Sequence, residues 1–267
     1  MLPLLSDRLP TNGDDLAQLL EQSLRRLVDT QNDIVAVREE AFPEIRELRI
    51  NLDGARLRTD GPRPSSVSGE TTLAFRVESF ELSARGLSVE DMPLDLRIHA
   101  NNVQLHQGRD RDRQLVLVLH AADSGRIDVS AAKADLEKLI LAIAKREADK
   151  QGVSIEDLKL SLSTVKPRAI EGIVQLRARK LFLRGVIRIA AKLEVDEKLT
   201  AKISGVTCTG DGAVGAMACN LLRPHLQRLD GRHLNLAALP LGEISLRDIE
   251  IAAGEKLGIT AQFGRVS

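Results

Sequence analysis

Three stretches of the chain carry apolar residues at the three- and four-residue spacing of an amphipathic helix. In the first of them, Leu16, Leu20 and Leu24 repeat along one face behind an acidic pair that suits a helix start. The third contains Pro224, which we expect to kink or split the helix. The predicted helices span residues 14–36, 131–151 and 212–230.

Between these helices the apolar period changes to two, which is typical of strands that bury one face. Leu48, Ile50 and Leu52 alternate with polar residues in this way. A longer pair of alternating runs over residues 187–203 turns at residues 196–197 and predicts an antiparallel hairpin.

The alternation changes phase at three places, and each change predicts a β-bulge that bends a long strand. The first is near Ser79, the second between Ile98 and Val103, and the third between Leu176 and Leu181. We therefore expect strongly bent strands.

The order of elements predicts an α+β fold, because strands and helices do not alternate regularly as they do in doubly wound proteins. We expect a strongly curved, bulged antiparallel sheet that wraps around the amphipathic helices. No composition shift marks a boundary, so we predict a single domain over residues 1–267, with strands in most of the chain outside the helices.

Composition narrows the classes of function. The chain has 38 Lys and Arg against 38 Asp and Glu, which gives no surplus of positive charge for duplex nucleic acid. It has no Trp or Tyr and five Phe, so base stacking is not expected either. No apolar run approaches the ~20 residues that cross a bilayer.

The start of the chain has neither a basic region nor the apolar stretch of a secretory signal, so we expect a cytoplasmic protein, with peripheral membrane contact as a further expectation. Cys208 and Cys219 are too few for a disulfide framework. In the cytoplasm they are expected to be reduced, and we interpret both as small core residues.

Residues 210–215 read Gly-Asp-Gly-Ala-Val-Gly, a literal match to the dinucleotide-binding fingerprint at the start of a helix. The strand before the motif alternates with polar residues and belongs to a hairpin, whereas the fingerprint follows a buried parallel strand. We therefore favour a flexible entry into the helix, with an anionic headgroup at the helix start as an alternative.

Ser130 and Lys133 have the S-x-x-K spacing of serine acyl-enzymes, but the companion motifs of those enzymes are missing. We interpret Ser130 as the N-cap of the helix that follows. The five His never fall at the spacing of a helical zinc pair. The sequence thus predicts no catalytic residue, no metal and no cofactor.

One segment is locally cationic in this neutral chain: residues 166–192 contain eight basic residues and one acid, Glu171. Arg184 and Arg188 alternate with Ile187 and Ile189, which predicts a basic outer face and an aliphatic inner face. Near anionic headgroups each such charge is worth about 1 kcal/mol; the alternative is a solvated face balanced by acids elsewhere. The expected headgroup or membrane contacts are Arg177, Arg179, Lys180, Arg184 and Arg188.

The order of elements resembles the LmeA-like bacterial phospholipid-binding family, whose fold is related to the tubular lipid-binding proteins. The resemblance lies in four stretches: the early helix from Asp15 to Val28, the strand from Glu47 to Gly54, the strand-to-helix step from Ile127 to Leu139, and the closing stretch from Leu239 to Ala261. It implies a lipid-binding protein without enzymatic activity, and it transfers no catalytic residue. Many family members are exported or anchored to a membrane.

We therefore expect a protein that binds phospholipid or another aliphatic lipid in an apolar groove, with lipid transfer or membrane maintenance as its role. The expected lining residues are Leu136, Leu139, Ile140, Ile143, Ile187, Ile189, Leu193 and Ile203. Each of them is equally well explained as plain core. The alternative is a structural or scaffolding protein whose helices fill the groove and leave no room for a ligand.

Overall fold

Long strands make up most of the chain in the computed structural model, which describes residues 2–4, 6–58, 67–89, 91–150, 152–236 and 244–265. Within these described residues, three helices accompany two open sheets, so the α+β class is confirmed at that level. The helices are α1 (Gly13–Leu24), α2 (Lys133–Asp149) and α3 (Gly212–Leu229).

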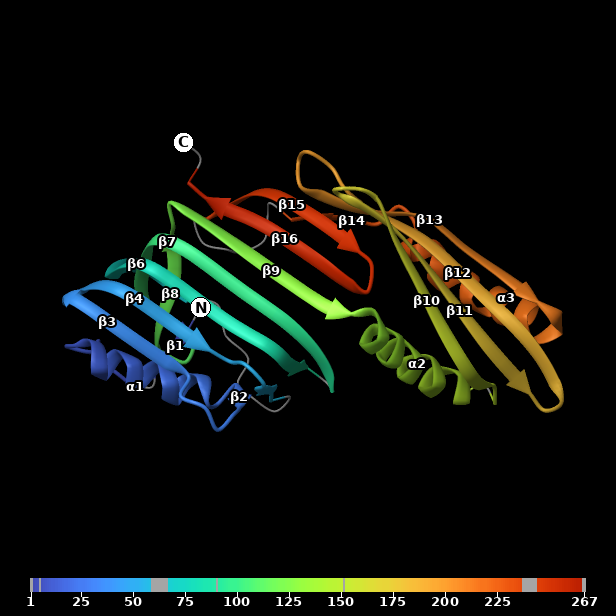
Figure 1. Cartoon of the computed structure of the whole chain (residues 1–267), viewed down its shortest axis with the longest axis horizontal. Helices are drawn as coiled ribbons and strands as arrows, with labels where there is room; N and C mark the ends of the chain where they lie inside the picture. Colours follow the sequence, from blue (N-terminus) through green and yellow to red (C-terminus); the bar gives the residue numbers. More distant parts are fainter. Residues whose placement is uncertain are drawn as a thin grey trace. The chain divides into compact units, whose positions relative to one another are not determined.

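The chain divides into two compact units, whereas the sequence led us to expect one domain. Unit 1 comprises residues 1–129, 239–248 and 260–267, and unit 2 comprises residues 130–238 and 249–259. Nothing in the composition changes at these boundaries; those after residues 129, 248 and 259 fall inside strands, and the one after residue 238 lies outside the described residues. Figure 1 shows the elements of both units along the chain.

The larger sheet has eleven strands over the described residues, in the central order β15-β16-β9-β7-β6-β4-β3. β8 pairs with β7, β1 with β8, and β5 with β2 and β6. Its strands are β1 (Leu2–Pro3), β2 (Val28–Asp29), β3 (Val35–Ala41), β4 (Glu44–Asn51), β5 (Arg56–Leu57), β6 (Val67–Val89), β7 (Met92–Asp110), β8 (Leu115–Ala121), β9 (Ser124–Ala132), β15 (Ser245–Ala253) and β16 (Lys256–Gly264).

The smaller sheet has five strands over the described residues and lies in unit 2, in the order β10-β11-β12-β13-β14. Its strands are β10 (Ser154–Lys166), β11 (Ala169–Lys180), β12 (Leu183–Val195), β13 (Thr200–Asp211) and β14 (His233–Asn235). The predicted hairpin is confirmed as β12 and β13, which pair antiparallel and turn at Asp196.

The core of unit 1 lies between α1 and the larger sheet. Leu16 and Leu20 on the helix contact a buried cluster that includes Leu48, Phe75 and Val77. These are the residues whose periodicity identified the helix and the strands, since each element buries the face that its spacing marks.

The first predicted helix is too long, because α1 ends at Leu24 rather than at residue 36. The Arg25 side chain donates hydrogen bonds to the carbonyl oxygens of Thr30 and Asn32 at 2.8 and 2.9 Å, and these bonds hold a polar turn against the helix end. Ile34 is buried after this turn, just before β3. Ile34 lies seven residues after Leu27, which is two turns of a helix. The same spacing also occurs when a turn separates a helix from a strand, so it does not show that the helix continues.

The other two predicted helices agree with α2 and α3 within two residues at each end that the structure describes; residue 151 lies outside the described residues. Helix α3 runs through Pro224 as one helix, so the predicted split is wrong. The first five residues of the closing stretch 239–261 also lie outside the described residues.

The bulge predicted near Ser79 is wrong, because the pairs Val77–Val103 and Ser79–Asn101 keep one register between β6 and β7. Asn102 of β7 has a φ of 51°, and the alternation of apolar and polar side chains along β7 changes phase at this residue. The alternation along β6 changes phase at the residues paired with it. The first two phase changes in the sequence are therefore one event on neighbouring strands. The register shifts of this pair lie between Ser68 and Thr72, Leu73 and Phe75, and Ala84 and Leu87.

Asp53, in the turn after β4, fastens that turn to β6. Its carboxylate accepts hydrogen bonds from the Ser83 hydroxyl at 2.7 Å and from the Arg85 backbone N–H and Nε at 2.8 and 2.7 Å. Partial burial acts to raise the pKa of Asp53, but the hydrogen bonds from Arg85 and Ser83 outweigh it and lower the pKa from 3.8 to about 2.

We expect Asp53→Asn to lower the stability of the chain above about pH 4 and to remove part of its acid sensitivity. A carboxyl whose pKa is lower in the folded state stabilises that state above its unfolded pKa, and this stabilisation is lost between about pH 4 and about pH 2. Urea unfolding at several pH values measures it. Asp91→Asn is the control, because Asp91 is exposed in a 3.5 Å ion pair with Arg56. Equal pH dependence in both variants would contradict the expectation.

Candidate functional site

The five-stranded sheet of unit 2 has one apolar face and one polar face. Directly opposite residues of antiparallel strands have side chains on the same face, and side chains alternate along each strand. The apolar face is formed by three rows that cross the strands: Leu158, Leu176 and Ile187; Leu160, Val174, Ile189 and Cys208; and Ile170, Leu193 and Ile203.

Both helices of unit 2 pack on this apolar face. α2 contacts β10, and α3 contacts β12 and β13. Leu136 and Ile140 of α2 and Val214 of α3 belong to one contact cluster with the sheet residues Leu176 and Ile187. This cluster is the core of unit 2.

The expected lining residues divide into two groups. The cluster brings together Leu136, Ile140, Ile187 and Ile189, while Leu139, Ile143, Leu193 and Ile203 lie outside it. Ile187 is 3% exposed and is a core residue, but the other seven keep part of their surface open to solvent, and Ile143 is 44% exposed.

Helix α2 is the less buried wall of this region. None of its residues, all of which the structure describes, is fully buried. Leu136, Ile140 and Ala144 contact the cluster, and Leu139 and Ile143 lie at the same spacing on an adjoining flank. The apolar part of α2 is therefore wider than the surface that the sheet covers.

The arginines of β11 and β12 lie on the opposite face of the sheet, whereas Lys180, directly opposite Leu183, lies on the face that carries the apolar rows. The register places Arg179 opposite Arg184, and Gln175 opposite Arg188, on the face that alternates with the apolar rows. The register therefore places Arg177, Arg179, Arg184 and Arg188 on the predicted outer face and corrects the prediction for Lys180; that these residues contact a headgroup stays a prediction. A ligand on the apolar face cannot reach the four arginines through the sheet.

The third phase change in the sequence is a hairpin turn and not a bulge, which corrects the prediction. β11 ends at Lys180 and β12 begins at Leu183, so Leu181 and Phe182 form the turn. Two-residue hairpin turns usually contain Gly, Asn or Asp. Because this turn has none of them, the sequence lacked the signal that would have identified it.

The glycines of residues 210–215 allow a close approach of α3 to the sheet. A Cβ on Gly210 would lie 2.2 Å from the carbonyl carbon and oxygen of Gly215, and a Cβ on Gly215 would lie 2.6 Å from the Val186 oxygen. The preceding strand β13 is antiparallel to β12. These glycines therefore serve close packing, which replaces the flexibility that we expected.

The first turn of α2 differs from the prediction. The helix begins at Lys133 after Ala132, whose side chain makes no capping hydrogen bond, and Ser130 belongs to β9. The predicted N-cap at Ser130 is therefore wrong. Instead the Lys133 N–H donates to the Glu255 carbonyl oxygen at 3.0 Å.

The two cysteines form a disulfide between β13 and α3, so the expectation of reduced thiols is wrong. Cys208 and Cys219 are 11 residues apart in the sequence, with their Cα atoms at 5.6 Å. Disulfides persist mainly in oxidising compartments.

No helix among the described residues has the length and apolar content that crossing a bilayer requires.

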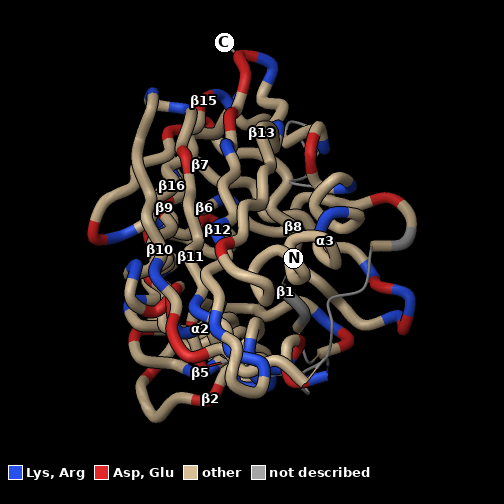
Figure 2. Tube along the Cα trace, turned by 90° about the vertical axis from the view of Figure 1, so that its right-hand side faces the viewer, with Lys and Arg blue, Asp and Glu red and all other residues tan. Residues whose placement is uncertain are grey.

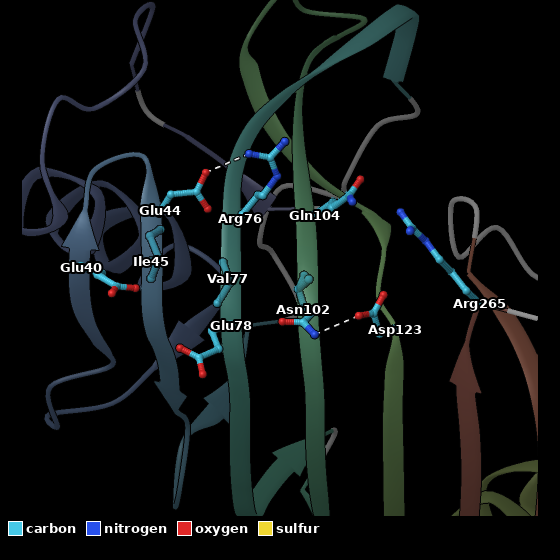
Figure 3. Close-up of a pocket in the computed structure, with 11 residues that line it drawn as sticks. Glu40, Glu44, Ile45, Arg76, Val77, Glu78, Asn102, Gln104, Asp123 and Arg265 are labelled. Carbon is cyan, nitrogen blue, oxygen red and sulfur yellow. Dashed lines mark hydrogen bonds and ion pairs between the residues drawn. The ribbon is translucent and has the colours of Figure 1, made fainter. Parts of the chain in front are cut away.

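Unit 1 has a polar pocket of about 330 Å³ that is lined by the middle of β6 and β7 and by residues of neighbouring strands (Figure 3). Arg76 donates to Glu44 at 2.9 Å, and the Asn102 amide donates to Asp123 at 2.8 Å. These polar groups bind one another across the strands, so the pocket offers little apolar contact to a ligand.

Comparison with protein-family models, curated proteins and solved structures finds no match to this chain in any of the three.

Proposed function

We propose that the chain is a non-enzymatic lipid-binding protein in which unit 2 holds an acyl chain against the apolar side formed by α2 and β10–β13. Membership of the LmeA-like family, and the tubular lipid-binding type of wrapping that it implies, are part of this proposal. The observation that carries it is the partial exposure of large aliphatic side chains on α2 and on the apolar face.

Partial exposure favours a ligand because apolar surface left in water costs about 25 cal/mol per Å². The flank of α2 at Leu139 and Ile143 and the row at Leu193 and Ile203 keep such surface open. An acyl chain in contact with these residues would remove it from water.

The dimensions of the sheet are adequate for this ligand. β12 has 13 residues, which at about 3.3 Å per residue gives about 43 Å. One acyl chain occupies about half of a ~30 Å hydrocarbon core. The strands are therefore long enough for one acyl chain to lie along them.

We expect phospholipid to copurify with the full chain, and Ile143→Glu to reduce the bound lipid by about tenfold or more, because a carboxylate would be desolvated against the acyl chain. Native mass spectrometry with lipid extraction measures the bound lipid. Ile143 is 44% exposed, so the substitution leaves the core intact. Ala142→Glu is the matched control, since Ala142 is exposed at the neighbouring position of the same helix.

The alternative function, a scaffolding protein without a ligand, is favoured by a different observation. The core cluster of unit 2 is continuous from Leu136 on α2 through Leu176 to Val214 on α3, so the helices fill part of the space over the sheet themselves. Purified chain that carries no lipid, and that takes up none from vesicles, would support this alternative and overturn the first.

A further inference from the structure

The turn between β11 and β12 presents two large apolar side chains to solvent. Leu181 is 81% exposed and Phe182 is 87% exposed, the highest values among the large hydrophobic side chains of the described residues. Leu183 beside them is 48% exposed. Isolated exposed apolar residues are ordinary, but three in succession at one tip mark an interaction site.

The tip is held in place by its strands. β11 and β12 pair without a register shift from Ala169–Glu194 to Lys180–Leu183, so the ladder continues up to the turn. In Figure 1 this hairpin projects at the end of unit 2 where α2 ends and α3 begins. A paired hairpin presents its tip in a defined position without further ordering.

The choice of residues in the turn is unfavourable for the turn itself. Leu181 has a φ of 54°, in the left-handed region that favours Gly, Asn or Asp. Neither Leu181 nor Phe182 contributes to the core clusters. Local folding therefore gives no reason for an apolar pair here, which points to a function outside the chain.

Basic residues flank the apolar tip on both strands. Arg179 lies directly opposite Arg184, a like-charge pair that is unfavourable in an isolated sheet. Arg179 is 3.4 Å from Glu156, whereas Lys180 and Arg184 make no ion pair with any described residue. Figure 2, which views the chain from this end, marks the Lys and Arg positions along the strands. An anion between the two strands would relieve the repulsion.

We propose that this hairpin tip, residues 179–184, inserts into the surface of an anionic phospholipid membrane. Leu181 and Phe182 enter the boundary of the acyl region, and Arg179, Lys180 and Arg184 contact lipid phosphates. Apolar residues bordered by cations are typical of interfacial membrane binding. The apolar side chains are buried at the boundary of the acyl region, and the cations bind the anionic headgroups directly above it. This surface is separate from the apolar face proposed to hold lipid, so either proposal can fail alone.

The experiment uses the full chain with vesicles of phosphatidylcholine alone and of phosphatidylcholine mixed with phosphatidylserine, in a cosedimentation assay. We expect binding to the anionic vesicles that weakens with salt. Leu181→Ser with Phe182→Ser should lower the affinity on the order of a hundredfold. Lys180→Gln with Arg184→Gln should lower it by about fivefold per charge removed.

Val165→Ser is the matched control, because Val165 is 45% exposed near the other end of the sheet and should leave vesicle binding unchanged. The tip variant should still copurify with lipid in the mass spectrometry assay, which separates this proposal from the first. Absence of vesicle binding, or binding that the tip variant retains, overturns the proposal. A tip variant that changes only the oligomeric state would assign the tip to a second copy of the chain and overturn it equally.

A spectroscopic readout locates the tip directly, because the chain has no Trp of its own. Phe182→Trp introduces a single fluorophore at the tip, and we expect its emission to shift to shorter wavelength on anionic vesicles and to be quenched by lipids brominated on their acyl chains. Val165→Trp should show neither effect. Unshifted emission from Phe182→Trp in the presence of bound vesicles would contradict insertion.

Discussion

Gly210→Ala is expected to destabilise unit 2 by about 3 kcal/mol or more. The added methyl group would lie 2.2 Å from the carbonyl carbon and oxygen of Gly215, which are backbone atoms at the start of α3. No rotamer change relieves such a contact, so the helix has to move away from β12 and β13. That movement would draw Val214 and Cys219 out of the core.

Urea unfolding of the full chain, followed by circular dichroism, measures this loss, and hydrogen exchange places it in the chain. Exchange should rise in α3 and β13 while the strands of unit 1 keep their protection, which makes unit 1 an internal control. Gly254→Ala is the matched variant, because Gly254 is exposed and its added Cβ would meet no atom within 4 Å. Equal unfolding curves for the two variants would refute the role assigned to Gly210.

Loss of the disulfide is the second large effect that we expect. Cys208→Ala with Cys219→Ala should cost roughly 2 to 4 kcal/mol, because the unfolded chain regains the freedom that the cross-link removes. The same substitution frees α3 from its covalent attachment to β13. The loss should appear in unit 2, as for Gly210→Ala.

A reductant distinguishes the bond from the packing of the two side chains. It should lower the urea midpoint of the unsubstituted chain and leave the double alanine variant unchanged. Thiol titration of the unfolded chain without reductant counts the free thiols directly. Two free thiols in chain purified under oxidising conditions would contradict the bond, and no free thiol would confirm it.

The periodic elements could be predicted from the sequence. α2, α3 and the β12–β13 hairpin follow from apolar spacing because each of them buries one face. The first helix was extended too far, because Ile34 in the chain leading into β3 continues the helical spacing across a turn. Spacing shows which residues share a face, but it does not show where the chain turns.

The candidate sites could be predicted only in part. The lining residues were identified as apolar, yet spacing cannot separate buried Ile187 from exposed Ile143, because each fits the apolar period of its own element, a strand for Ile187 and a helix for Ile143. The tip at Leu181 and Phe182 lacks turn residues and was missed. The pairing of the cysteines depends on how α3 lies on β13, which no local pattern encodes.

The two helices of unit 2 are attached with unequal strength. α3 is joined to the sheet by the disulfide and by close backbone contact between Gly210 and Gly215. α2 has no fully buried residue. Its polar link to the sheet is the 2.8 Å hydrogen bond that Glu137 accepts from the Leu160 N–H. If lipid binding requires unit 2 to open, α2 is the helix that would move, and α3 would stay attached to the sheet. The rates of lipid entry and release would then depend on the free energy that separates α2 from β10.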